Sequence, residues 1–98
     1  MALGSLGSNP FPDSTPEFFQ KLESLLNQAM DGELKLIRPF DHLHKTDVLL
    51  RGKDLPLHLT FSCISPVEGQ HCGACNKCAE RKTGFADAGL PDETSYFR

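Results

Sequence analysis

All four cysteines of the chain lie between positions 63 and 78, and the last three follow Cys-x-x-Cys-x-x-Cys spacing. A two-residue gap lets both sulfurs of a tight turn face one ion, and the segment before this run can fold back to supply a fourth ligand. Gly69 and Gly73 permit the sharp turns that such a loop requires. The pattern therefore predicts a tetrahedral, structural zinc site with four sulfur ligands: Cys63, Cys72, Cys75 and Cys78.

Disulfides and an iron–sulfur cluster are the two alternatives for these cysteines. No basic residue precedes Lys21, and no apolar stretch is long enough for a signal peptide, so we expect a cytoplasmic protein with reduced thiols. A ferredoxin run continues with a fourth cysteine, whereas residues 79–82 read Ala-Glu-Arg-Lys. Zinc is the preferred interpretation. His71 is adjacent to Cys72, and since adjacent side chains rarely reach one ion together, we expect it to lie partly solvated beside the site.

Size and charge restrict the partners of the chain. At 98 residues it is one small domain, and metal binding would contribute to its folding free energy. The formal net charge is −3, and four thiolates around one divalent ion would lower it to about −5. Phosphate binding needs a basic face, and no apolar run approaches the length of a membrane span. We therefore expect neither direct nucleic-acid binding nor membrane insertion.

Three segments follow one another along the chain. Residues 1–15 form a loop and helix entry, residues 16–61 an α/β segment of helix, strand and helix, and residues 62–98 the zinc-binding segment with a C-terminal helix and tail. In the first helix, from Glu17 to Met30, Pro16 favours Thr15 as N-cap, while a capping box from Ser14 is the competing register. Gly32 is the candidate C-cap.

Apolar residues between 33 and 38 predict a short strand closed by Pro39, and residues 57–61 show a weaker strand alternation. A second helix capped by Thr46 or Asp47 should stop at Gly52. A third should run from about 77 to 88 with Phe85 inward, followed by a tail that folds back through its aromatic residues. The expected fold class is a mostly helical α/β fragment with about three helices, one or two short strands and a four-cysteine knuckle.

The first helix carries a wide apolar face that includes Phe18, Leu22 and Leu25. Core packing is the simplest explanation of such a face. Its width, however, requires a larger partner surface than this chain offers. We expect the face to be exposed, or to be covered by self-association.

The cysteine block resembles the 7-cyano-7-deazaguanine synthase family of queuosine biosynthesis, described as ExsB-like and belonging to the PP-loop ATP pyrophosphatases. The similar stretches are residues 59–63 (Leu-Thr-Phe-Ser-Cys) and 71–82 (His-Cys-Gly-Ala-Cys-Asn-Lys-Cys-Ala-Glu-Arg-Lys). Residues 12–18 resemble the Pro-Asp helix entry of the family, and residues 44–48 resemble a helix start that follows its strand. The resemblance covers nearly the whole chain.

This resemblance implies the C-terminal part of a Rossmann-like PP-loop fold with a parallel sheet. It also implies an ATP-dependent ligase that adenylates 7-carboxy-7-deazaguanine and replaces the carboxylate with ammonia, giving the amide and then the nitrile. The ATP-binding loop of the family, Ser-Gly-Gly-x-Asp-Ser, is absent from the sequence. We therefore expect the chain to be a C-terminal portion that binds zinc. The N-terminal PP-loop region, and ATP as a cofactor, belong to the full-length parent, and the chain should be inactive alone. The alternative is a free-standing zinc module that docks onto a protein or nucleic acid.

The resemblance also assigns roles to two residues outside the cysteine block. Lys45 matches a lysine that lies near the phosphates in related ATP pyrophosphatases, and a lysine at a helix start suits an anion. The alternative is an ordinary surface lysine. Asp13 could accept a hydrogen bond from a guanine-like edge, but an interaction of its charge with the helix dipole is the preferred explanation.

Overall fold

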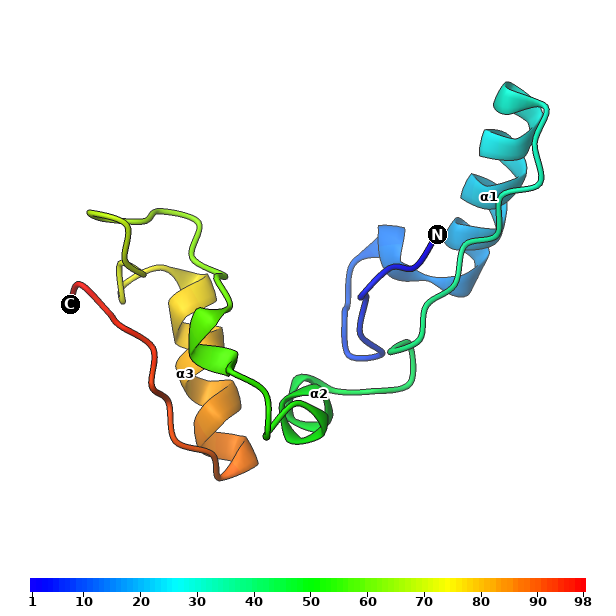
Figure 1. Ribbon diagram of the computed structural model, residues 1–98. Coiled ribbons are helices and arrows are strands. Elements are labelled where there is room, and N and C mark those ends of the chain that lie inside the picture. Colours follow the sequence, from blue (N-terminus) through cyan, green and yellow to red (C-terminus); the bar gives the residue numbers. More distant parts are fainter. The chain divides into compact units, whose positions relative to one another are not determined.

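The computed structural model describes all 98 residues, which form three α-helices and two short 3-10 helices (Figure 1). In chain order these are η1 (Pro12–Ser14), α1 (Pro16–Met30), α2 (Lys45–Arg51), η2 (Leu57–Leu59) and α3 (Asn76–Ala88). The mostly helical fold expected from the sequence is confirmed. None of the helices is both long and apolar enough to cross a bilayer.

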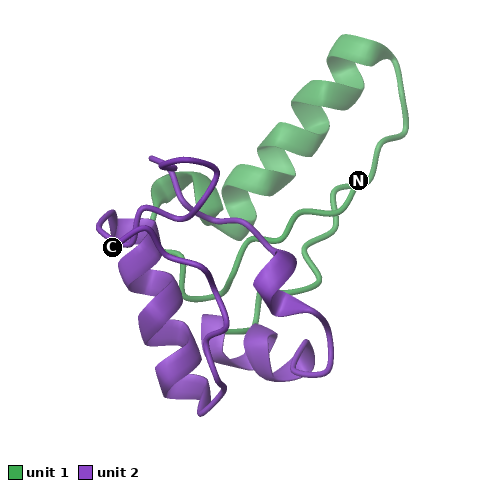
Figure 2. Cartoon of the chain, turned by 60° about the vertical axis from the view of Figure 1, so that its left-hand side comes forward, with its two compact units in different colours: residues 1–44 green, residues 45–98 purple.

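The chain divides into two compact units, residues 1–44 and residues 45–98 (Figure 2). The first contains η1 and α1, and the second contains α2, η2, α3 and all four cysteines. This division groups residues by proximity in space, whereas the three segments expected from the sequence are successive stretches of chain. The segments therefore stay a prediction.

Helix α1 begins at the cap that Pro16 favours. Thr15 has extended backbone angles, and its Oγ1 accepts a 3.2 Å hydrogen bond from the N–H of Phe18. The structure thus selects the Thr15 register over the one from Ser14. The other end differs from the prediction, because Asp31 rather than Gly32 takes the left-handed conformation, with φ 48°. Aspartate tolerates this region better than most residues.

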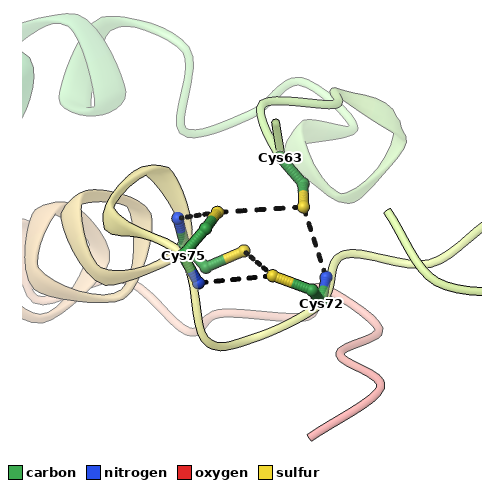
Figure 3. Close-up of side chains that lie close together, drawn as sticks. Cys63, Cys72 and Cys75 are labelled. Carbon is green, nitrogen blue, oxygen red and sulfur yellow. Dashed lines mark hydrogen bonds between the residues drawn. The ribbon is translucent and has the colours of Figure 1, made fainter. Parts of the chain in front are cut away.

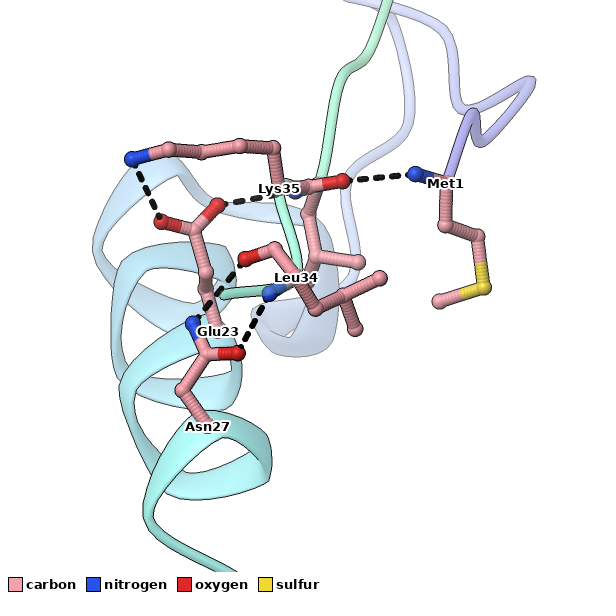
Figure 4. Close-up of polar contacts among 6 residues, drawn as sticks. Met1, Glu23, Asn27, Leu34 and Lys35 are labelled. Carbon is pink, nitrogen blue, oxygen red and sulfur yellow. Dashed lines mark hydrogen bonds and ion pairs between the residues drawn. The ribbon is translucent and has the colours of Figure 1, made fainter. Parts of the chain in front are cut away.

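Two side chains of α1 hold the segment that follows the helix (Figure 4). The Asn27 amide makes two hydrogen bonds with the backbone of Leu34, donating to its C=O at 2.9 Å and accepting from its N–H at 2.7 Å. The Glu23 carboxylate accepts a 2.8 Å bond from the N–H of Leu36. This segment therefore runs back along α1, held by side chains of the helix.

The strand expected at 33–38 is reduced to a single parallel bridge between Ala2 and Ile37. The N–H of Leu3 donates to the C=O of Ile37, and the N–H of Ile37 donates to the C=O of Met1, both at 2.9 Å. The amino group of Met1 continues this pairing with a 2.6 Å bond to the C=O of Lys35. The alternate backbone groups, those of Leu34 and Leu36, are bound by the side chains of Asn27 and Glu23. Parallel pairing across an intervening helix is nevertheless the topology of a βαβ unit.

The prediction of a strand at 57–61 is wrong, because η2 occupies the first three of these residues. The Thr60 hydroxyl donates a 2.6 Å hydrogen bond to the C=O of Leu57, and the Thr60 N–H reaches the same oxygen at 3.1 Å. A threonine that bonds locally to the backbone competes with pairing in a sheet.

In the second unit, helices α2 and α3 pack closely at Gly84. A Cβ built on this buried glycine would lie 3.1 Å from Leu49 Cδ1 and 3.4 Å from Lys45 Cγ. Helix α2 begins at Lys45, earlier than the expected caps, and ends before Gly52 as predicted. Helix α3 ends at Gly89, which has φ 67°, and Phe85 is buried, as the sequence also predicted.

The C-terminal tail folds back as expected from its aromatic residues. Tyr96 forms a parallel bridge with His71, and the N–H of Phe97 donates to the C=O of His71 at 2.8 Å. The Tyr96 hydroxyl donates a 2.7 Å bond to Asp92 within the tail. The tail is thereby attached to the residue that precedes Cys72.

The apolar face of α1 (Phe18, Leu22 and Leu25) is incompletely covered. No residue of this helix is buried, Phe18 is 38% exposed and Leu25 is 62% exposed. The first unit thus supplies too little apolar surface to cover its own longest helix.

Candidate metal centre

The four cysteine sulfurs converge on one point in the second unit (Figure 3). All four Sγ atoms lie within 4.8 Å of one another, with Cys63 and Cys75 separated by 3.8 Å and Cys72 and Cys78 by 3.9 Å. A tetrahedral ion with metal–sulfur bonds of about 2.3 Å places its sulfurs about 3.8 Å apart. The four thiols are therefore positioned to hold one metal ion.

Local structure places each ligand. Cys63 follows η2, Cys75 is the N-cap of α3, and Cys78 lies in the first turn of that helix. Between Cys72 and Cys75 the chain turns at Gly73, which has φ 78°. A Cβ on Gly73 would collide with the backbone carbonyl of Arg98, so this turn requires glycine for its space as well as its angle.

Backbone N–H groups point at three of the sulfurs. Cys63 accepts two such bonds at 3.3 Å, Cys72 accepts two at 3.3 Å, and Cys75 accepts one at 3.4 Å. The donors are the backbone amides of Ser65, Cys72, Ala74, Cys75 and Cys78. Hydrogen bonds of this kind stabilise thiolates, which are the form that binds a metal.

The thiols differ in acidity because their surroundings differ. Hydrogen bonding from the backbone of Ile64, and then from that of Cys78, lowers the pKa of Cys75 to about 6. Bonding from the backbone of Ala74 lowers the pKa of Cys72, although burial opposes it. Burial raises the pKa of Cys78 to about 11. Metal binding at neutral pH must therefore displace the proton of Cys78.

The geometry suits one ion better than either alternative. A disulfide requires sulfurs about 2.05 Å apart, and all four cysteines are free. In an iron–sulfur cluster the thiolates bind different irons and so spread around a larger body than one ion. Four sulfurs around a tetrahedral ion also leave no coordination position for a reacting water.

His71 is buried, at 4% exposed, so the expectation of a partly solvated histidine is wrong. Its Nε2 accepts a 3.2 Å bond from the N–H of Ser62, and its ring centroid lies 4.2 Å from that of Phe61 and 5.8 Å from that of Tyr96. Burial, and then the charge of Arg81, lower the pKa of His71. The His71 ring is thus neutral, and it packs against Phe61 and Tyr96 beside the cysteine cluster.

Arg81 has a structural role in this region that sequence reasoning missed. It is 6% exposed, and its guanidinium donates to the Thr94 hydroxyl at 2.8 Å, the Leu57 carbonyl at 2.9 Å and the Thr60 hydroxyl at 3.1 Å. The one available signal was its position three residues after Cys78, which places both on one face of a helix. Arg81 joins η2, α3 and the tail.

The two other residues singled out from the sequence lie outside the cysteine cluster. Lys45 is the first residue of α2, half-buried, with the aliphatic part of its side chain against Gly84 of α3. Asp13 is exposed in η1, in the other unit. Their roles toward phosphate and substrate stay predictions.

Comparison with known proteins identifies relatives along most of the chain. The family model described as queuosine biosynthesis protein QueC matches residues 2–89. A 7-cyano-7-deazaguanine synthase of Methanothrix thermoacetophila is 38% identical over 88% of this chain and 40% of its own length. The enzyme of the same name from Syntrophotalea carbinolica is 36% identical over 100% of this chain and 46% of its own length.

A third relative, from Leptospira interrogans and with the same name, is 32% identical over 95% of this chain and 41% of its own length. The chain thus spans less than half the length of the curated relatives it matches. No solved structure shows significant similarity to it.

Proposed function

The chain belongs to the QueC family of queuosine biosynthesis proteins, and from this premise we propose that it is the zinc-bearing C-terminal portion of a 7-cyano-7-deazaguanine synthase. The observation that carries the proposal is the convergence of all four cysteines in a chain that matches this family along most of its length. The alternative of a free-standing zinc module rests on the metal site alone and does not account for the match outside the cysteine block.

Zinc is the ion that we propose for the site. Four thiolates in tetrahedral arrangement select soft or borderline ions, and zinc is the usual occupant of a structural site with four cysteines. Such a site needs reduced thiols, which supports a cytoplasmic location. The role of the ion is structural, because it joins the loop from Cys63 to Cys72 to the start of α3.

The activity that we propose for the whole enzyme is ATP-dependent conversion of 7-carboxy-7-deazaguanine and ammonia to the nitrile. The chain has no Ser-Gly-Gly sequence, so the nucleotide-binding loop must come from an N-terminal PP-loop region. Alone, the chain is inactive. Within the enzyme, Lys45 would lie near the ATP phosphates. A hydrogen bond from the base of the substrate to Asp13 is the alternative to the preferred interaction of that charge with the helix dipole.

The same N-terminal region is the proposed partner of the apolar face of α1. Partial exposure of Phe18 and Leu25 supports this proposal, since a helix with that surface packs against a sheet in an α/β protein. In the isolated chain, self-association would cover the face instead.

Metal analysis and a turnover assay test the proposal. The purified chain should contain one zinc per chain, and removing it with a chelator should abolish the tertiary structure of residues 45–98, seen as loss of amide dispersion in NMR spectra. The chain should hydrolyse no ATP alone and gain 7-cyano-7-deazaguanine synthesis when fused to the N-terminal region of a relative. A metal-free chain that stays folded, or ATP turnover by the chain alone, would contradict the proposal.

A further inference from the structure

The four cysteines of the metal centre form two pairs that differ in access to solvent. Cys63 and Cys75 are both half-buried, and their sulfurs are separated by 3.8 Å (Figure 3). Cys72 is 7% exposed, Cys78 is 0% exposed, and their sulfurs are separated by 3.9 Å. Distance alone does not distinguish the pairs, but the residues of the first pair are more accessible to a solute that attacks sulfur.

The backbone next to the first pair is also the more exposed of the two. Cys63 leads into a loop in which Ile64 is 68% exposed and Gly69 has open space around it. Each pair has one member at the start of α3, so the pairs differ at the loop member: Cys72 follows the buried His71, whose backbone is bonded to the tail. A disulfide requires the sulfurs to approach from 3.8 Å to about 2.05 Å. A surface loop can make this movement at lower cost than a buried segment that is bonded to the tail.

We propose that Cys63 and Cys75 form a peroxide-sensitive pair, whose oxidation to a disulfide opens the metal site and releases the ion. This inference rests on the proposed zinc site. Solvent-accessible thiolates with a second cysteine in reach are the ones that hydrogen peroxide oxidises reversibly.

The reaction balances with peroxide as the oxidant. One thiolate of the pair attacks the O–O bond of hydrogen peroxide, becomes a sulfenic acid and releases hydroxide. The second thiolate attacks that sulfur, the S–S bond forms, and a second hydroxide leaves. The two sulfurs lose two electrons, the peroxide gains them, and two protons from solvent convert the hydroxides to water.

Loss of two ligands changes the structure around the ion. Only Cys72 and Cys78 would remain, and two sulfurs do not hold zinc in a structural site. Cys75 is also the N-cap of α3, and its sulfur accepts the N–H of Cys78 at 3.4 Å. Oxidation therefore alters the start of α3 together with the loop from Cys63 to Cys72. A dithiol reductant with added zinc reverses both changes.

The chain has convenient cleavage sites for testing which sulfurs pair. Cleavage after Glu68 and Lys77 separates Cys63, the segment 69–77 with Cys72 and Cys75, and Cys78 into three fragments. The zinc-loaded chain is treated with one equivalent of hydrogen peroxide, free thiols are alkylated, and zinc release is followed with a chromogenic chelator. Mass spectrometry then identifies the linked fragments and the alkylated cysteines.

We expect one zinc released per disulfide, a link between the Cys63 fragment and segment 69–77, and alkylation of Cys72 and Cys78. Met30→Leu, which removes an exposed oxidisable side chain in the other unit, should release zinc equally. A link from segment 69–77 to the Cys78 fragment, alkylation of Cys75 in place of Cys72, or zinc retained after peroxide would overturn the inference. A chain that binds no zinc before oxidation would overturn the proposed site as well.

Discussion

The guanidinium of Arg81 donates a 2.8 Å hydrogen bond from Nε to the hydroxyl of Thr94, and so fastens the tail to α3. The same side chain reaches the carbonyl of Leu57 at 2.9 Å. One buried cation thereby joins three segments that come from distant parts of the sequence. Its acceptors are neutral, and Phe85 provides an aromatic face 5.4 Å from the guanidinium carbon.

Replacing Arg81 should therefore destabilise the second unit. Arg81→Met removes the donors and leaves buried acceptors without partners, which should lower the free energy of unfolding by roughly 2–3 kcal/mol. Arg81→Lys should recover only part of this loss, because an ammonium cannot reproduce the planar fork. Denaturant unfolding of the zinc-loaded chain measures the free energy of unfolding of both variants.

Arg51→Met is the matched control, since Arg51 is exposed at the end of α2. It should change the free energy of unfolding by less than about 0.5 kcal/mol. Equal effects at the two positions would contradict the assigned role of Arg81.

The tail also carries a spectroscopic probe, because Tyr96 is the only tyrosine and the chain has no tryptophan. Burial, and then the hydrogen bond to Asp92, raise the pKa of Tyr96 to about 12 from a usual value of 10.0. The folded state thus favours the protonated phenol. Its contribution to stability is complete below pH 10 and is lost as the pH rises through 12.

Ultraviolet absorbance of tyrosinate after a rapid jump in pH should show a midpoint near 12. Asp92→Asn should move the midpoint down toward 10, because it removes the carboxylate that accepts the hydroxyl proton. Asp87→Asn, an exposed acidic residue of α3, is the control and should leave the midpoint unchanged. A midpoint near 10 in the unmodified chain would show that the tail does not dock.

Local signals explain which parts of this structure were predictable from the sequence. Thr15 before Pro16 determines the start of α1 through backbone geometry of adjacent residues, and Gly89 ends α3 in the same way. The four cysteines were equally predictable, because their spacing is itself the chemical requirement. Each of these features depends on a few neighbouring positions.

Two of the errors concern contacts between distant positions. His71 was expected to be partly solvated, and it is buried because Phe61 and Tyr96 close around its ring. The segment at 33–38 was expected to be a strand, and the side chains of Glu23 and Asn27 instead bind its backbone from α1. Neither contact can be predicted from the neighbouring residues in the sequence.

Zinc binding should depend on pH in two stages. Because burial raises the pKa of Cys78 to about 11, zinc competes with at least one proton throughout the neutral range. Below pH 6 the thiolate of Cys75, with a pKa of about 6, becomes protonated too. Zinc affinity should therefore fall as the pH is lowered, and the slope of its logarithm against pH should steepen below about 6. Competition titration with a chromophoric chelator between pH 5 and pH 8 would show a single constant slope if this assignment is wrong.

Two glycines of the cysteine loops should respond differently to alanine. Gly69 and Gly73 have nearly equal φ angles of 76° and 78°, so both substitutions carry the strain of a left-handed backbone, about 1 kcal/mol. A Cβ at Gly69 meets open space, whereas one at Gly73 collides with the carbonyl of Arg98. Gly73→Ala should therefore destabilise the zinc-loaded chain more than Gly69→Ala in thermal unfolding. Equal shifts in the midpoint would mean that the tail does not close over Gly73.

The apolar face of α1 makes the oligomeric state a test of the proposed parentage. Leu25 is 62% exposed and Phe18 is 38% exposed, so the isolated chain should self-associate or bind a hydrophobic dye. Leu25→Glu should weaken association and dye binding, because it places a carboxylate on this face. Gln20→Glu adds the same charge at an exposed position outside the apolar face and should have little effect. Light scattering over a range of concentrations distinguishes these outcomes. A compact monomer that binds no dye would instead favour the free-standing zinc module, since such a module must bury this face within itself.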